Sequence, residues 1–411
     1  MPYSRSQSHR RTRQRNRNKL RRWLVINLIL LAAVIAAAVW VWSELRGDEN
    51  RGTVDKPRTE TAPPAESQAT SPAAPTESSA AVPSPLASPT PEETGDRSGS
   101  VTFAFVGDIL PAARVAELMD KYGYDYPYRE ARSLLEAADL TAGNLETSIT
   151  TRGDPAQNKQ YLFRGPAEAL PAIKDAGFDV LSLANNHSLD YGWVGLRDTM
   201  DALDDIQLPH VGAGADAAEA YTPRYLERNG LTVGFIGVTR VVPETDWKAG
   251  TNHPGLAEAY DPTKVIAAIR EAKGNADLVV VLVHWGIEKA ERPDDKQKTL
   301  GHAFVDAGAD LVIGSHPHVL QGFEAYKGKW IAYSLGNFVF STTGNPKTSE
   351  TGVLQAECAA DGECKLAFNP MLSKQSQPAP MEPEAAKEIL NRLNDLSYGA
   401  IVKENGHIEA K

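Results

Sequence analysis

The sequence predicts an α/β protein whose strands end in metal-binding side chains. Six apolar runs that read as buried strands are each followed at once by Asp, Asn, Glu or His. Helical segments lie between them, with apolar residues three and four apart. Because ligands bind outside the carboxyl ends of the strands in such sheets, we expect these endings to share one site. The six runs cover 101–108, 138–146, 179–187, 277–286, 309–318 and 330–338.

The alternation of strand and helix favours one large α/β domain over 100–345. A seventh strand is expected at 231–240. Helices are predicted over 114–123, 128–139, 165–177, 193–205, 261–274 and 295–308. Beyond Phe340 the pattern changes, and 346–411 should form an antiparallel hairpin followed by a helix over 383–397 that packs on the outside of the domain.

The amino-terminal part predicts a membrane anchor. Residues 1–22 carry nine Lys or Arg and no acid, and 23–43 form an apolar run broken by Asn27. About twenty apolar residues span a bilayer, and positive charge keeps its side in the cytoplasm. A cleaved signal peptide is the alternative, but the run is long and Val39 to Trp42 make a poor cleavage site. We therefore expect a basic cytoplasmic tail, in contact with anionic lipid, and a single-pass signal anchor.

A disordered linker is expected between the anchor and the main domain. Residues 44–99 are rich in Pro, Ala, Ser, Thr and Glu and have almost no large apolar side chains. The main domain would then lie outside the cell. The net charge is −10, and without the nine positive charges of 1–22 it is −19. This acidity disfavours nucleic acid as a partner, and it would repel an anionic polymer unless a metal or a local basic patch compensates.

The chain has two cysteines, Cys358 and Cys364. Asp361 and Gly362 lie between them and favour a turn, so a hairpin would place the two thiols opposite each other. In an oxidising exterior a disulfide is the expected state. A zinc site is a weaker interpretation, because no further Cys or His follows nearby.

The residues at the strand ends suit a divalent transition metal, since imidazole, carboxylate and amide oxygen are suitable ligands together. A single histidine after a strand is more often structural, but the order of several such endings favours a shared site. His316 and His318 lie two apart, and in an extended loop they would point the same way, with Gly314 allowing a sharp turn just before them. The residues to be explained are Asp108, Asn144, Glu146, Asn185, Asn186, His187, His284, Glu288, His316, His318 and Asn337.

Taken in order, these motifs resemble the CapA family of poly-γ-glutamate capsule biosynthesis proteins, a branch of the calcineurin-like metallophosphoesterase superfamily. The resemblance covers about 101–345 and rests on GD, NLE, ANNHSLDYG, HWG-x-E, DAGADLVIGSHPHVLQG and YSLGNFVF. It implies a four-layer α/β/β/α sandwich with a metal site at one sheet edge. It also implies an anchored protein that acts beside a membrane polyglutamate synthase complex on an anionic polymer.

The resemblance also implies residue roles. The superfamily's metal ligands fall on Asp108, Asn186, His284, His316 and His318, and its general acid falls on His187. The site would hold one or two divalent ions, which would be Mn, Zn or Fe. Two departures concern the first metal and the bridge. Leu110 replaces a histidine ligand. The bridging aspartate falls at Asn144, with Glu146 two residues later as the substitute, so Asn144 and Glu146 are also predicted as metal ligands.

Three functions remain open at this point. The first is a membrane-anchored, extracellular component of polyglutamate capsule synthesis or export whose metal site hydrolyses or transfers polymer. The second is a metal-dependent phosphoesterase of cell-envelope phosphates, and the third is a polymer-binding subunit without catalysis. Retention of His187 beside Asn186 favours catalysis, whereas Leu110 in place of a ligand favours binding.

Overall fold

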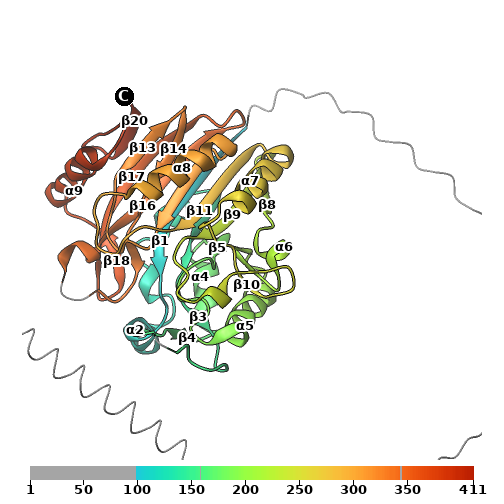
Figure 1. Cartoon of the computed structure of the whole chain (residues 1–411). Helices are drawn as coiled ribbons and strands as arrows, with labels where there is room; N and C mark the ends of the chain where they lie inside the picture. Colours follow the sequence, from blue (N-terminus) through green and yellow to red (C-terminus); the bar gives the residue numbers. More distant parts are fainter. Residues whose placement is uncertain (1–98, 158, 343–344) are drawn as a thin grey trace, which may run out of the picture. The chain divides into compact units, whose positions relative to one another are not determined.

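The computed structural model describes residues 99–157, 159–342 and 345–411 (Figure 1). The predicted tail and anchor, and the linker up to residue 98, lie outside the described residues. Within the described part, none of the helices combines the length and the apolar character that a membrane span requires. The described residues form a mixed α/β fold, which confirms the predicted class.

Two large sheets form the framework of the fold. The first has ten strands, with the path β19-β20-β17-β16-β1-β2-β5-β6, while β15 pairs with β1 and β18 with β17. Its strands are β1 Ser100–Ile109, β2 Leu140–Leu145, β5 Val180–Ser182, β6 His210–Val211, β15 Asn337–Val339, β16 Glu350–Ala359, β17 Cys364–Lys374, β18 Gln377–Pro380, β19 Ala400–Val402 and β20 His407–Ala410.

The second sheet has six strands in the order β13-β14-β12-β11-β9-β8. They are β8 Arg224–Arg228, β9 Leu231–Thr239, β11 Leu278–His284, β12 Leu311–Ser315, β13 Phe323–Tyr326 and β14 Lys329–Ala332. Two short pairs lie apart from both sheets: β3 Ser148–Ile149 with β4 Arg164–Gly165, and β7 Ala213–Gly214 with β10 Gly255–Leu256.

Except for α6, which the periodicity does not predict, the helices occupy the predicted positions, although α3 and α4 are shorter than their apolar patterns. Helices α7 and α8 lie together over the second sheet (Figure 1). The bounds are α2 Arg114–Tyr122, α3 Arg132–Glu136, α4 Ala169–Asp175, α5 Gly192–Asp205, α6 Ala217–Ala220, α7 Thr263–Asn275, α8 Asp295–Ala307 and α9 Pro383–Leu396.

The alternation of side chains along the strands creates the layers. On β1, Val101, Phe103 and Phe105 enter a core shared with the second sheet, whereas Ala104 and Val106 enter a core shared with α2 to α5. Strand β11 divides its side chains in the same way, between the first sheet and helices α7 and α8. Successive side chains of a strand point to opposite faces, so both sheets are covered on both sides. The layers therefore run helices, sheet, sheet, helices.

The carboxyl-terminal segment is part of the framework. Strand β16 pairs with β1 along six positions, from Ser100 opposite Ala359 to Phe105 opposite Leu354, and β17 continues the same sheet. The predicted hairpin is thus present, but it completes the larger sheet. The helix that follows, α9, packs Leu390 against the core between the two sheets and keeps its opposite side exposed at the edge of the domain (Figure 1).

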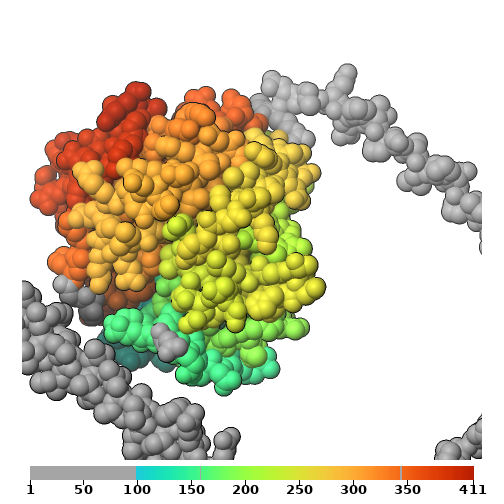
Figure 2. All heavy atoms as spheres, in the orientation of Figure 1, coloured from blue at the N-terminus to red at the C-terminus, as the bar shows by residue number. Residues whose placement is uncertain are grey.

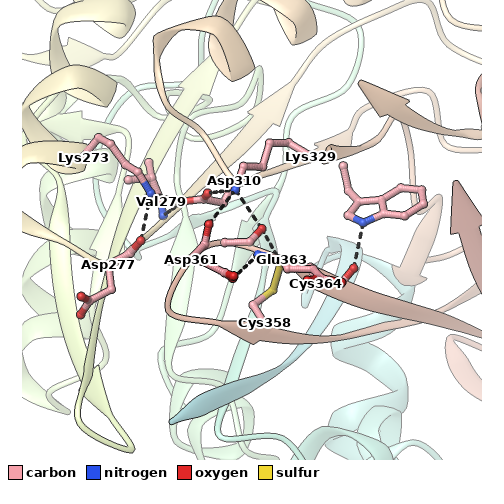
Figure 3. The surroundings of a disulfide bond; sticks show 11 residues. Lys273, Asp277, Val279, Asp310, Lys329, Cys358, Asp361, Glu363 and Cys364 are labelled. Atoms are coloured by element: carbon pink, nitrogen blue, oxygen red, sulfur yellow. Dashed lines mark hydrogen bonds and ion pairs between the residues drawn. A yellow bond between two sulfur atoms is a disulfide. The ribbon is translucent and has the colours of Figure 1, made fainter. Parts of the chain in front are cut away.

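The two cysteines face each other across this hairpin. Cys358 of β16 is paired with Cys364 of β17, and they form a disulfide with Cα atoms 4.1 Å apart. Lys329 of the second sheet reaches the turn, where its Nζ donates to the Gly362 carbonyl at 2.9 Å (Figure 3). The disulfide therefore joins two strands of one sheet, and the turn contacts the other sheet.

A buried carboxylate reinforces this junction. Asp310 is 1% exposed, and it pairs with Lys329 at 2.7 Å and with Lys273 at 3.0 Å (Figure 3). Its Oδ2 also accepts from the backbone N–H of Val279 at 2.9 Å. Two cations and a backbone donor offset the cost of burying the charge.

Candidate metal centre

The carboxyl ends of strands from both sheets meet at one place. Asp108 of β1 lies opposite Asn144 of β2 and also opposite Asn337 of β15. In the second sheet, His284 ends β11 and lies opposite Ser315, the last residue of β12. The Nδ2 atom of Asn144 is 3.2 Å from Nδ1 of His284, which connects the two sheets. The edge predicted from the sequence therefore exists and belongs to two sheets.

Two groups of possible ligands share Glu146. One consists of Glu146, His284 and His316, and the other of Asp108, Glu146 and His318. Within each group, the ligand atoms lie within 4.8 Å of one another. A histidine and carboxylate set at this spacing could hold a divalent ion. The sharing of one carboxylate would allow two ions to lie side by side.

The buried polar atoms fit a cation. Both carboxylate oxygens of Glu146 and Nδ1 of His316 are buried without a hydrogen-bond partner among the described residues. A buried carboxylate that lacks a partner costs several kcal/mol, by order of magnitude. A divalent ion between these atoms would remove that cost.

Burial and mutual charge set the protonation of the ligands. Burial and the nearby Asp108 raise the pKa of Glu146 well above its usual range. Burial alone would lower the pKa of His318, but the carboxylates of Glu146 and Asp108 outweigh it and raise that pKa to about 10. Glu146 and His318 thus retain a proton between them at neutral pH, which an incoming ion must displace.

The other two histidines are neutral and ready to bind. Burial lowers the pKa of His316 to about 3, and burial also lowers the pKa of His284 well below its usual range. Neutral imidazole is the form that binds metals. These two side chains therefore require no proton loss before they coordinate.

The loop that carries His316 and His318 is not extended, contrary to the prediction. His316 has a φ of 95° and His318 a φ of 57°, so both lie in the left-handed region that non-glycine residues rarely adopt. The two rings consequently face different ligand groups, with centroids 5.7 Å apart. Such strain persists where the surroundings fix it, which is common at functional sites.

Three asparagines have different roles. The Oδ1 atom of Asn186 is 2.7 Å from Nε2 of His284, so this amide oxygen faces the first ligand group. The sequence predicts Asn144 as a ligand, but its Oδ1 accepts from Asn185 at 3.0 Å and its Nδ2 donates to Asp108 at 2.8 Å. In this arrangement Asn144 orients Asp108, while Asn186 has the position of a ligand.

His187 lies beside the ligand groups and belongs to neither. Its Nδ1 is 2.7 Å from Oδ2 of Asp190 and 2.9 Å from Nζ of Lys159. Lys159 also pairs with Asp190 and donates to the Asn186 carbonyl. Burial lowers the pKa of His187, and Asp190 opposes that change. Asp190 thus fixes the ring and leaves Nε2 for proton transfer.

Sequence reasoning did not find Lys159 and Asp190 as parts of the site. Asp190 lies three residues after His187 within ANNHSLDYG, and this spacing on one turn could have indicated a carboxylate partner. Lys159 lies in a loop between β3 and β4, and nothing in the local sequence relates it to the strand ends. Its role depends on tertiary structure.

The sequence also predicts Glu288 and Asn337 near the site. Asn337 supports it, since its Oδ1 is 2.8 Å from Nδ1 of His318. Glu288 is exposed on the loop after β11 and is in neither ligand group. Leu110, at the position where the resemblance implies a histidine, is fully buried.

The family model described as "Bacterial capsule synthesis protein PGA_cap" matches residues 102–342. The chain belongs to this family. That range includes both ligand groups and His187. The resemblance to CapA proteins is therefore confirmed.

Two relatives extend the similarity over most of their own length. "Capsule biosynthesis protein CapA" of Bacillus anthracis is 36% identical over 321 residues, which cover 76% of this chain and 77% of that protein. "PGA biosynthesis protein CapA" of Bacillus subtilis is 35% identical over 312 residues, which cover 75% of this chain and 81% of that protein. A solved phosphatase structure from Mycoplasma pneumoniae overlaps 67% of this chain and 94% of its own with a TM-score of 0.40 and 18% identity.

Proposed function

We propose that the chain is a metal-dependent hydrolase in poly-γ-glutamate capsule biosynthesis. Membership of the PGA_cap family and the printed names of the two Bacillus relatives support the process. The metal dependence is supported by Glu146, which two ligand groups share and whose buried carboxylate oxygens have no hydrogen-bond partner among the described residues. The metal would be a divalent transition ion, held by Asp108, Glu146, Asn186, His284, His316 and His318.

The side chains around the ligands suit hydrolysis of an amide or ester. A divalent ion, when bound there, would supply Lewis acidity and lower the pKa of a water molecule. His187 would donate a proton to the leaving group from Nε2. Asp190 holds the ring through Nδ1 at 2.7 Å, and Lys159 restrains Asp190. The Phe163 ring packs beside the His187 ring, with the two centroids 4.5 Å apart.

Metal removal tests this proposal. Treating the purified full-length chain with a chelator should abolish shortening of poly-γ-glutamate, and Mn²⁺ or Zn²⁺ should restore it, because the proposed hydrolysis depends on the ion. Polymer length is followed by size-exclusion chromatography, with an aryl phosphodiester assayed in parallel. Cleavage of the phosphodiester alone would favour the phosphoesterase alternative. If metal-loaded protein cleaves neither substrate, the remaining alternative is a polymer-binding subunit without catalysis, which Leu110 in place of a histidine ligand favours.

We further propose that 23–43 anchor the chain in the membrane and place the described domain outside the cell, beside a membrane polyglutamate synthase complex. The sequence of 1–43 supports the orientation. The Cys358–Cys364 disulfide also supports an exterior location, because disulfides persist in oxidising compartments.

Protease accessibility is the measurement for this orientation. Protease added to intact cells should release the folded domain by cutting within 44–99, because that segment would be exposed outside. Release from lysed cells alone would contradict an external domain. Cross-linking in intact cells should capture a membrane synthase subunit, and capture of cytoplasmic proteins alone would exclude that partner.

A further inference from the structure

Three cationic side chains lie in a row beside the metal centre, although the chain is acidic. Two aromatic rings lie between the cations. Nζ of Lys159 is 5.3 Å from the Trp247 ring, and Nζ of Lys248, the residue after Trp247, is 4.5 Å from the Tyr260 ring. The Arg240 guanidinium lies 5.0 Å from the same Tyr260 ring. We call these five residues the basic row.

Both ends of the basic row are attached to the site. At one end, Nζ of Lys159 is 2.9 Å from Nδ1 of His187. At the other end, the backbone N–H of Arg240 donates to the His284 carbonyl at 2.8 Å. In the space-filling view, the segment around residue 250 adjoins the segment before residue 165, as the contact of Lys159 with Trp247 requires (Figure 2). The basic row therefore borders the metal centre.

The outer cations of the basic row are poorly neutralised. Arg240 forms no ion pair with any residue that the structure describes, and Lys248 has one pair at 3.9 Å, with Glu258. By comparison, the exposed Lys327 pairs with Asp306 at 2.6 Å. Arg240 and Lys248 approach the same ring, so their charges repel each other, and an anion between them would relieve that repulsion.

We propose that the basic row is a subsite that binds carboxylates of an acidic polymer next to the metal centre. Arg240 and Lys248 would pair with carboxylates, while the Tyr260 ring packs against the methylene groups between them. Trp247 is 8% exposed and Lys159 is held by Asp190, so these two residues form the wall between the subsite and His187. Tyr260 is 44% exposed and so remains open to such contact. That the polymer is polyglutamate rests on the proposed function. That the subsite recognises closely spaced carboxylates rests on its cations and its exposed ring.

Alternating cations and rings fit such a chain better than they fit a polyphosphate. A polymer of acidic residues offers both charge and methylene surface, and cationic side chains can also bury their own aliphatic stems against rings. A polyphosphate has charge but no apolar surface to cover the exposed Tyr260 ring. A polymer bound there would lie beside the wall of Trp247 and Lys159 and thus near His187.

The double variant Arg240→Gln/Lys248→Gln tests the subsite, because these two side chains are outside both ligand groups. Binding of a fluorescent oligomer of γ-linked glutamate to the full-length chain is measured by anisotropy. We expect roughly tenfold weaker binding in the double variant, with a smaller dependence on salt, since two charge pairs are lost. Its metal content, measured by elemental analysis, should equal that of the wild type.

Lys298→Gln is the matched control, because Lys298 of α8 is half-buried and lies 4.5 Å from the Tyr398 ring, as Lys248 lies 4.5 Å from the Tyr260 ring. Wild-type binding by the double variant would overturn the subsite, as would equal competition by an uncharged glutamine oligomer. Competition by polyphosphate but not by polyaspartate would overturn the carboxylate class. Metal-free wild-type protein that still binds the oligomer through Arg240 and Lys248 would contradict the hydrolase and leave the subsite intact.

Discussion

Replacing Glu146 with glutamine is expected to empty the whole metal centre. Glu146 belongs to both ligand groups, so the change removes the shared negative charge from each of them. We expect metal affinity to fall by more than about a hundredfold, because loss of a direct ligand exceeds the effects of outer contacts. Elemental analysis of purified wild-type and variant chains gives the result directly.

Single-group variants separate one ion from two. His316→Ala affects one ligand group and His318→Ala affects the other. In a two-ion centre, each of these variants should therefore retain about one ion per chain, whereas the Glu146→Gln variant should retain none. Glu288→Gln is the matched control, since Glu288 is an exposed acid on the loop that follows His284, and it should retain all the metal. Full metal content in Glu146→Gln would exclude the shared ligand.

Replacing His187 with asparagine should abolish hydrolysis and leave the metal in place. His187 contacts Asp190 and Lys159 and is in neither ligand group, so its loss removes the proton donor alone. General acid catalysis contributes typically about 10² to 10⁴ in rate, and we expect kcat to fall within that range. The assay is shortening of poly-γ-glutamate by metal-loaded protein.

His302→Asn controls for the removal of a histidine that has a carboxylate partner. His302 lies 2.9 Å from Glu324 and stacks on Tyr326, and it belongs to neither ligand group. It should keep both metal and activity. If His187→Asn lost its metal, His187 would be a ligand, and if it kept full activity, the proton would come from another group.

Local sequence determined much of the fold, because apolar alternation and helical periodicity are local signals. The sequence predicts strands over 101–108 and 277–286, and β1 and β11 occupy them. The run 179–187 is different: β5 ends at Ser182, and the residues after it form the loop that carries Asn186 and His187. Apolar residues continue into that loop because it is buried, and burial alone does not distinguish loop from strand.

The types of ligand residue could also be predicted from the sequence, whereas their assignment to two ligand groups could not. Strand endings indicate Asp108, His284 and His316, since each comes at the end of an apolar run. That Glu146 joins two groups depends on the left-handed backbone at His316 and His318, which aims neighbouring rings in different directions. No spacing rule contains that conformation, and Lys159 enters the site only through tertiary contacts.

The position of β1 has a consequence for how the chain matures. Its partner β2 comes soon after it, beyond α2 and α3, but the other flank pairs Ser100 with Ala359, so that edge stays open until most of the domain has been synthesised. Contacts of such high sequence separation slow folding, and an unpaired strand edge invites association between nascent chains. Asp108 lies on this strand and the ligands extend to His318, so the metal-binding edge is completed only after the strands of the second sheet have been synthesised.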